Sequence, residues 1–191
     1  TDRGTPIISD PGYKTVKYVS DNGYNVVALP GATAFACALV TSGISPQPFL
    51  FYGILNSKDS KKREELELIK ENEYTMIFYE APHRIIKTLN MMLEVFGNRE
   101  ISISREITKK FESIYRGKLE DVIKIVPEKG EFVIVVEGNK LSNIDFNLSI
   151  KEAVDLYIKN GFDVMTSIKK VAKDRKIPKN GVYKEYHGKD D

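Results

Sequence analysis

The chain has 191 residues, 41% of them hydrophobic and 29% charged, which is the composition of a globular protein and excludes a disordered or fibrous one. A formal net charge of +2 excludes a polycationic coat for nucleic acid. The single cysteine, Cys37, excludes an internal disulfide and a zinc site built from several cysteines. No apolar stretch approaches the roughly 20 residues that a membrane-spanning helix needs, so we expect a cytoplasmic protein.

The chain begins with a dense turn-forming motif, TDRGTP at residues 1–6, without an initiator methionine or a signal-peptide pattern. A motif of this kind normally follows a strand, and none precedes it in this sequence. We therefore expect the chain to be a fragment whose N-terminal part lies upstream.

The next 40 residues should form a helix, a short strand and a second helix. Asp10 is placed to cap the first helix, with Pro11 at its first position, and an apolar stripe continues to Val19. The apolar run Tyr24–Leu29 is typical of a strand, and an alanine-rich helix should follow over Ala32–Val40.

From residue 49 onward, strand and helix patterns alternate. Strands are expected at residues 49–55, 75–79, 100–104, 111–115 and 132–136, and helices at 61–70, 85–96 and 119–126. This alternation predicts an α/β layered sheet.

The last part of the chain has a different pattern, with three short helices that resemble a helix-turn-helix unit. A polar linker precedes it, Ser149 and Glu152 form a capping box, and Pro178 begins the third helix. Residues 165–189 contain 8 basic and 2 acidic side chains. This excess fits a nucleic-acid surface or, equally well, the lysines of an ordinary solvated face.

Turn clusters in the first 34 residues could hold a ligand. In TDRGTPIISDPG (residues 1–12), Gly4 and Gly12 allow a close approach of the backbone, and Asp2 and Asp10 could accept hydrogen bonds. PGATA at residues 30–34 opens a helix whose free N–H groups would face a cleft. The alternative to a ligand site is an ordinary strand-to-helix turn for residues 1–12, and close packing of the helix against the sheet for residues 30–34.

Charged groups follow two strands. EAPHR places Glu80, His83 and Arg84 at the carboxyl end of a buried strand, where open α/β sheets bind ligands. Arg105 and Lys109 follow the next strand, where an Arg–Glu ion pair is the structural alternative. Lys58, Lys61, Lys62 and Arg63 form a basic segment that is a solvated face by default. No phosphate-binding lysine loop, histidine pair at metal spacing or Ser–His–Asp signature is present.

These motifs resemble those of the rRNA small-subunit methyltransferase I family, the rRNA cytidine-2′-O-methyltransferases of the tetrapyrrole methylase superfamily. The resemblance runs through TPIISDPG, PGATA, FLFYGIL, IFYEAPHR, SREITK, RGKLED and GEFVIVVEG. Arg3, Asn56 and Ala32 depart from the family pattern, and Arg3 could crowd the cofactor side.

The resemblance implies a tetrapyrrole-methylase-like, two-lobe αβα architecture with S-adenosyl-L-methionine between the lobes and a C-terminal helical, helix-turn-helix-like extension. Residues 1–29 would end the first α/β lobe and residues 30–138 would form the second. Residues 139–148 would be a linker and residues 149–191 a small helical tail domain.

The reaction implied is 2′-O-methylation of a cytidine ribose in small-subunit ribosomal RNA, by a homodimer and without a metal. As base or substrate orienter we expect Glu80 or Glu106. We expect the cofactor to contact Asp2, Gly4, Thr5, Pro6, Asp10, Pro30, Gly31, Ala32 and Thr33. We expect RNA to contact His83, Arg84, Arg105, Lys109, Lys58, Arg63, Lys169, Lys170 and Lys173. A methylase of tetrapyrrole precursors and a non-catalytic RNA-binding module are the alternatives.

Overall fold

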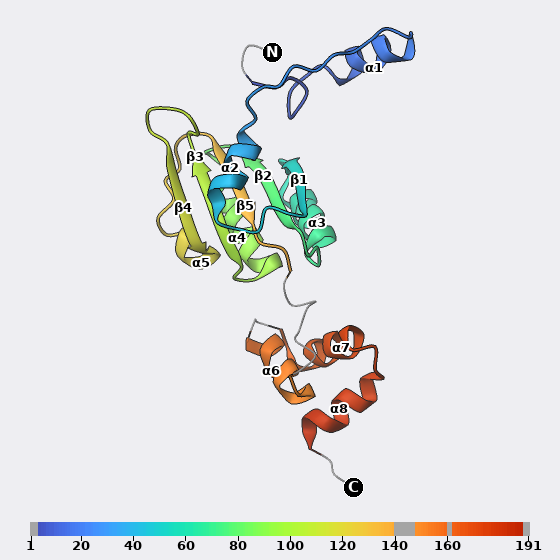
Figure 1. Cartoon of the computed structure of the whole chain (residues 1–191). Coiled ribbons are helices and arrows are strands. Elements are labelled where there is room, and N and C mark those ends of the chain that lie inside the picture. The colour runs from blue at the N-terminus through green and yellow to red at the C-terminus, as the bar shows by residue number, and fades with distance from the viewer. Residues whose placement is uncertain (1–3, 140–147, 160–161, 189–191) are drawn as a thin grey trace.

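The computed structural model describes residues 4–139, 148–159 and 162–188 and shows an α/β lobe followed by three helices (Figure 1). The lobe contains a five-stranded sheet of strand order β1-β2-β5-β3-β4. The strands are β1 (Phe49–Ile54), β2 (Thr75–Glu80), β3 (Glu100–Arg105), β4 (Ser113–Lys118) and β5 (Phe132–Val136). β1 and β2 are parallel, whereas β5 is antiparallel to β2 and β3, and β3 is antiparallel to β4.

Helices cover both faces of this sheet (Figure 1). α2 (Ala34–Ser42) lies on one face, and α3 (Asp59–Ile69), α4 (Ile85–Phe96) and α5 (Leu119–Val122) lie on the other. Successive side chains of a strand point to opposite faces. In β5, Ile134 accordingly packs in the core beneath α4, and Val133 and Val135 pack beneath α2. An uninterrupted apolar strand is therefore required at this central position.

The position of α2 is fixed at its middle and at its C-terminal end. Ala38 is fully buried against the sheet, and the small side chain lets the helix approach closely. At the C-terminal end, the Arg116 guanidinium on β4 donates to the carbonyls of Thr41 and Ser42, which have no partner within the helix. Gly43 then ends the helix with a φ of 78°. These contacts set where the N-terminus of α2 points.

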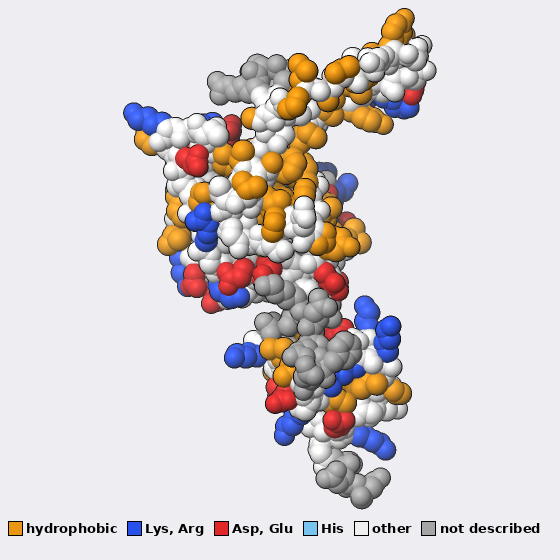
Figure 2. Space-filling model, in the orientation of Figure 1, with side chains coloured by type: hydrophobic (Ala, Val, Ile, Leu, Met, Phe, Trp, Pro, Cys, Tyr) orange, Lys and Arg blue, Asp and Glu red, His pale blue; other side chains and the backbone are white. Residues whose placement is uncertain are grey.

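The N-terminal arm, residues 4–33, differs from the sequence prediction in two ways. Gly12, not Asp10, occupies the N-cap of α1 (Tyr13–Asp21), and no side chain caps this helix. The strand predicted at residues 24–29 is irregular chain, because no strand of the described residues lies beside it to pair with its N–H and C=O groups. Val27 and Leu29 are 72% and 82% exposed. Figure 2 shows apolar side chains along this arm and on the neighbouring face of the lobe.

Two further boundaries differ from the prediction. The fourth strand begins two residues later than expected and continues to Lys118, because residues 116–118 pair with residues 100–102 of β3. The helix predicted at 119–126 ends at Val122, after which hydrogen bonds of the i→i+3 type form a turn. The other strands and helices of the lobe are confirmed to within about two residues at each end.

The three C-terminal helices, called here the helical tail (residues 148–159 and 162–188), have a core of their own. They are α6 (Ile150–Lys159), α7 (Val164–Asp174) and α8 (Lys179–His187). The predicted capping box is confirmed, since Ser149 N donates to a Glu152 carboxylate oxygen and Glu152 N to Ser149 Oγ. The predicted linker falls largely on residues 140–147, outside the described residues. No helix in the described ranges has the length and hydropathy to cross a bilayer.

Candidate functional site

Several strand ends meet at one edge of the sheet. β5 runs antiparallel to β2 and β3, so Phe132 at its start pairs with Glu80 at the end of β2 and with Arg105 at the end of β3. β1 is parallel to β2 and ends at the same edge. The N-terminus of α2 lies beside this edge, because Phe35 N donates to the Tyr79 hydroxyl at 3.1 Å. Ligands of open α/β sheets bind in crevices at such edges.

Two adjoining cavities open there, each of about 340 Å³. The first cavity lies over the ends of β1 and β2, and its walls include Ile54, Glu80, Ala81, Arg84, Phe132 and Val133. The second cavity lies between the N-terminal arm and the start of α2, and its walls include Gly4, Thr5, Ala32, Thr33, Cys37 and Thr108. Both cavities are within the size range of roughly 300–1,000 Å³ that is typical of small-molecule sites.

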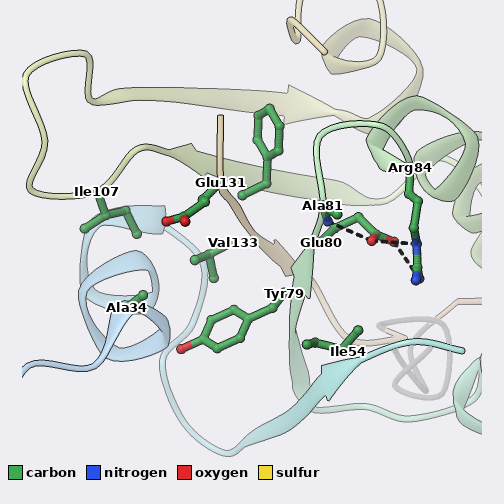
Figure 3. A pocket seen from close by; sticks show the side chains of 10 residues that line it. Ala34, Ile54, Tyr79, Glu80, Ala81, Arg84, Ile107, Glu131 and Val133 are labelled. Carbon is green, nitrogen blue, oxygen red and sulfur yellow. Dashed lines mark hydrogen bonds and ion pairs between the residues drawn. The ribbon is translucent and has the colours of Figure 1, made fainter. Parts of the chain in front are cut away.

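The two cavities share one wall, formed by Ala34, Tyr79, Ile107 and Glu131. Figure 3 shows these four side chains around the same space. Burial raises the pKa of the Tyr79 hydroxyl, which therefore stays protonated at neutral pH. The shared wall thus combines apolar surface with one hydroxyl and one carboxylate.

Small residues bring the arm and the α2 segment together in the second cavity. Thr5 N donates to the Ala32 carbonyl at 3.0 Å. A Cβ on Gly4 would lie 2.8 Å from Ala32 O, and a Cβ on Gly31 would lie 2.9 Å from Thr5 Oγ1. The Thr33 hydroxyl at the N-cap of α2 makes no capping bond. The close approach leaves hydroxyl groups and the N-terminus of a helix facing the cavity.

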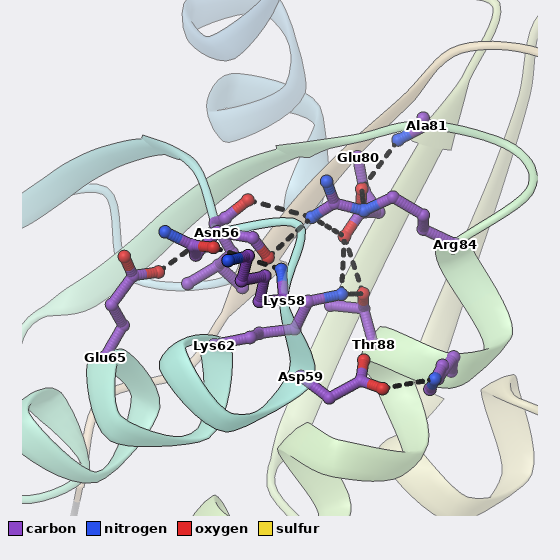
Figure 4. Close-up of polar contacts among 11 residues, drawn as sticks. Asn56, Lys58, Asp59, Lys62, Glu65, Glu80, Ala81, Arg84 and Thr88 are labelled. Atoms are coloured by element: carbon purple, nitrogen blue, oxygen red, sulfur yellow. Dashed lines mark hydrogen bonds and ion pairs between the residues drawn. The ribbon is translucent and has the colours of Figure 1, made fainter.

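Glu80 is part of a buried charge network and not an open carboxylate (Figure 4). Its carboxylate oxygens accept hydrogen bonds from Ala81 N and Thr88 Oγ1. Arg84 Nε lies 2.9 Å from Glu80 Oε1 and forms an ion pair with it, but the N–H is not aligned for a hydrogen bond. Lys62 Nζ lies 3.7 Å from Glu80 Oε2 and donates to Thr88 Oγ1 at 2.7 Å. The side chains of Glu80 and Lys62 are each 1% exposed.

This network fixes Arg84 in the wall of the first cavity. Arg84 Nη2 also donates to the carbonyls of Leu55 and Asn56, which ties it to the end of β1. Burial lowers the pKa of Lys62, and the nearby Glu80 carboxylate offsets part of that effect. The sequence placed Lys62 on a solvated basic face, and the structure shows that placement to be wrong.

A second group of charges joins the end of β3 to the start of β5. Glu106 N donates to the Glu131 carbonyl at 3.0 Å, and Glu131 N donates to Glu106 Oε1 at 2.9 Å. Lys109 Nζ bridges the two carboxylates, 3.2 Å from Glu106 Oε1 and 2.8 Å from Glu131 Oε2. The Glu131 N–H and Lys109 lower the pKa of Glu106, and the two carboxylates raise the pKa of Lys109.

The loop that carries these charges is strained. Glu106 and Thr108 have φ values of 52° and 64°, a conformation that costs a non-glycine residue about 1–3 kcal/mol. Gly130 (φ 106°) faces the loop so closely that a Cβ would lie 2.9 Å from Glu106 Cγ. Only glycine fits this position, and the contacts around Glu131 keep the loop in its strained form.

The remaining candidate residues are dispersed. Asp2 lies outside the described residues, and Pro6, Asp10, Pro30 and Gly31 do not line either cavity, although Gly31 shapes the second one. His83 and Lys58 are exposed, Arg63 pairs with Glu94 across α3 and α4, and Arg105 donates to the carbonyls of Lys129 and Phe111. Among the described residues, no group of three or more His, Cys, Asp or Glu side chains could hold a metal ion.

The three lysines expected to bind RNA together in the helical tail are not equivalent. Lys169 and Lys173 are exposed on α7. Lys170 is 18% exposed, forms an ion pair with Glu71 of the lobe at 2.8 Å and lies over the Phe162 ring at 4.7 Å. Its ammonium therefore links the tail to the lobe.

Sequence reasoning did not select Tyr79, Ile107 or Glu131. Tyr79 looked like an ordinary strand residue, and Glu131 looked like a charge before a strand. The signal that could have found them is the antiparallel pairing of β5, which brings its start to the ends of β2 and β3.

Comparison with known proteins gives the family. The pattern of the family described as Tetrapyrrole (Corrin/Porphyrin) Methylases matches residues 1–123. The chain belongs to this family. "Ribosomal RNA small subunit methyltransferase I" of Bacillus subtilis is 48% identical over 98% of this chain, which covers 67% of that protein. The protein of the same name from Halalkalibacterium halodurans is 42% identical, again over 98% of this chain and 68% of its own length.

Solved structures show the same fold at low sequence identity. The methyltransferase CobJ matches with a TM-score of 0.53 at 18% identity, over 71% of this chain and 62% of that one. A structure titled as a diphthine synthase from Entamoeba histolytica matches with a TM-score of 0.50 at 11% identity, over 66% of this chain and 59% of that one. The α/β fold and the family resemblance expected from the motifs are confirmed.

The buried network gives a testable energetic consequence. Lys62→Met leaves the Glu80 carboxylate buried with one cationic partner fewer, and we expect the free energy of unfolding to fall by about 3 kcal/mol in urea titrations. Lys61→Met, the same change on the exposed neighbour, should change it by less than about 0.5 kcal/mol. In the double variant Lys62→Met/Glu80→Gln the loss should be smaller than the sum of the single losses. Equal, small effects of the Lys62 and Lys61 substitutions would contradict the network.

Proposed function

We propose that this chain catalyses the transfer of a methyl group from S-adenosyl-L-methionine to the ribose 2′-oxygen of a cytidine in small-subunit ribosomal RNA. Membership of the tetrapyrrole methylase family supports methyl transfer from S-adenosyl-L-methionine. The names of the relatives support ribosomal RNA as the substrate. The observation that carries the proposal is the pair of cavities with a shared wall, because a group transfer needs two ligands that meet at one place.

The second cavity fits the cofactor. Gly4, Ala32 and Ala34 let a nucleoside-sized ligand approach the backbone, and the hydroxyls of Thr5 and Thr33 can bond its polar groups. The first-turn N–H groups of α2 offer further donors. When bound, S-adenosyl-L-methionine supplies a methyl group on a cationic sulfur. The residues of this cavity hold and orient that donor toward the shared wall.

The first cavity fits a nucleotide of the substrate. Tyr79 provides an aromatic surface on which an unstacked base can lie, and Ile54 adds an apolar wall. The Arg84 guanidinium, held by Glu80, can pair with a phosphate. A base bound there places its ribose next to the shared wall.

The helical tail provides an RNA contact outside the cavities. Lys169 and Lys173 are exposed on α7, and Figure 2 shows basic side chains on the tail around it. Such charges bind phosphates and position an RNA without reading its bases. A ribosomal RNA substrate supports a cytoplasmic location for the protein. The exposed apolar side chains of the arm, among them Tyr13, Val27 and Leu29, support a homodimer.

A methylation assay tests the function directly. Small ribosomal subunits are incubated with the full natural polypeptide that carries this chain and with labelled S-adenosyl-L-methionine, and the modified nucleotide is mapped. We expect label on one cytidine ribose. Gly31→Ala puts a Cβ 2.9 Å from Thr5 Oγ1, and we expect its affinity for the cofactor, measured by calorimetry, to fall about tenfold or more.

Gly181→Ala on α8 is the matched control, since a Cβ there meets nothing within 4 Å. Label on a base or on protein would contradict the substrate proposed. Equal cofactor affinities of the Gly31 and Gly181 variants would contradict the use of the second cavity.

The tail makes a separate prediction. Lys169→Glu/Lys173→Glu should weaken RNA binding. It should also make the negative slope of log K against log salt shallower by about 1.4, the value for two phosphate contacts on single-stranded RNA. Binding is measured by fluorescence anisotropy at several salt concentrations. Lys118→Glu/Lys124→Glu carries the same charge change on the lobe and should leave the slope unchanged. Equal slopes for the two double variants would show that the tail lysines form only a solvated face.

A further inference from the structure

We propose that Glu131 accepts the proton of the RNA hydroxyl that is methylated, and that Lys109 and Glu106 are its positioning residues. This inference rests on the proposed function and assigns to its site a residue that sequence reasoning did not select. It starts from the wall that the two cavities share, because the reacting atoms of both ligands must meet there.

The shared wall offers two polar side chains, Tyr79 and Glu131 (Figure 3). The Tyr79 hydroxyl accepts a hydrogen bond from Phe35 N, and its raised pKa keeps it protonated. It can donate to a ligand but cannot act as a base at neutral pH. The Glu131 carboxylate can accept a proton, and a general base must lie within hydrogen-bond reach of the proton that it removes.

The other two carboxylates of the region are less well placed. Both oxygens of Glu80 have partners in the buried network, and its side chain is 1% exposed. Glu106 bonds the Glu131 N–H and Lys109 through Oε1 and lines neither cavity. Glu131 is 81% exposed and meets Lys109 through Oε2, and no described residue bonds its Oε1. Among the described residues, Glu131 is therefore the carboxylate that both cavities can reach.

The surrounding loop holds this carboxylate in place. Glu131 is tied to Glu106 by one backbone hydrogen bond and by one from its N–H to the Glu106 carboxylate, and Lys109 Nζ binds both carboxylates. Strained conformations such as those of Glu106 and Thr108 persist where the surrounding structure determines them, and they cluster at functional sites. Here the strain brings Lys109 back over Glu131, which keeps that carboxylate at the shared wall.

The chemical step balances without a further reactant. The hydroxyl oxygen forms the bond to the methyl carbon and displaces a neutral thioether, which keeps the electron pair of the broken carbon–sulfur bond. Glu131 takes the hydroxyl proton and then releases it to water. Lys109 keeps its own proton throughout and orients the carboxylate.

The test compares Glu131→Gln with wild type in the full natural polypeptide, by single-turnover methyl transfer to small ribosomal subunits and by calorimetry with S-adenosyl-L-methionine. We expect the transfer rate to fall about 100-fold or more while the dissociation constants of cofactor and RNA stay within about twofold. Glu131→Asp should recover part of the rate. Lys109→Ala should lower the rate about tenfold, and Lys109→Arg should restore most of it, because a cation is required there.

Glu128→Gln is the matched control, with the same change on an exposed residue three positions earlier, and should transfer at the wild-type rate. Wild-type transfer by Glu131→Gln would overturn the inference and leave the proposed function standing. A loss of cofactor affinity in Glu131→Gln, with normal transfer at saturation, would also overturn it. Absence of transfer by the wild-type protein would overturn the proposed function and this assignment together. If Glu131→Gln does not fold, the Asp and Lys109 variants decide the question.

Discussion

The site depends on one reciprocal contact, in which Glu106 and Glu131 exchange hydrogen bonds between the end of β3 and the start of β5. β5 is the central strand of the sheet, and its residues are buried on both faces. A loop attached to its first residues is therefore attached to a strand that is buried along its whole length. The loop and the start of β5 place Ile107 and Glu131 opposite the N-terminus of α2, and these elements together form the wall between the two cavities.

The buried network around Glu80 has a different consequence. A carboxylate with backbone, hydroxyl and guanidinium partners is stable as an anion in a dry site, and it holds its cationic neighbours in one arrangement. Arg84 is thereby directed at the first cavity from a position that Leu55 and Asn56 also fix. In EAPHR, the acid holds the arginine in place. The motif places a guanidinium in the wall of the first cavity, whereas Glu131 lies outside EAPHR and lines the shared wall.

The sequence predicted the sheet well where strands are buried on both faces, because uninterrupted apolar runs such as Phe132–Val136 have few alternatives. It failed at Tyr24–Leu29, where an apolar run has no neighbouring strand among the described residues, since pairing is not a property of the run itself. The candidate site was predicted in part. Gly4, Thr5, Ala32 and Thr33 line the second cavity, because turn residues before a helix produce close backbone approaches.

Side-chain burial and charge pairing could not be predicted in the same way. Lys62 and Lys61 are adjacent and chemically identical, yet only Lys62 points beneath the sheet toward Glu80. Lys109 and Lys170 were expected to bind phosphates, but each is drawn to carboxylates that are distant in sequence, Glu131 and Glu71. These partners are set by strand order and by the placement of the helical tail.

A crystal structure of the protein with bound S-adenosylhomocysteine tests most directly whether the two cavities form one transfer site. We expect the ligand in the second cavity, against Thr5 and Thr33, with its sulfur at the wall formed by Ala34, Tyr79, Ile107 and Glu131. The first cavity should remain open for a nucleotide. A ligand bound in the first cavity, or anywhere away from this shared wall, would contradict the proposed site.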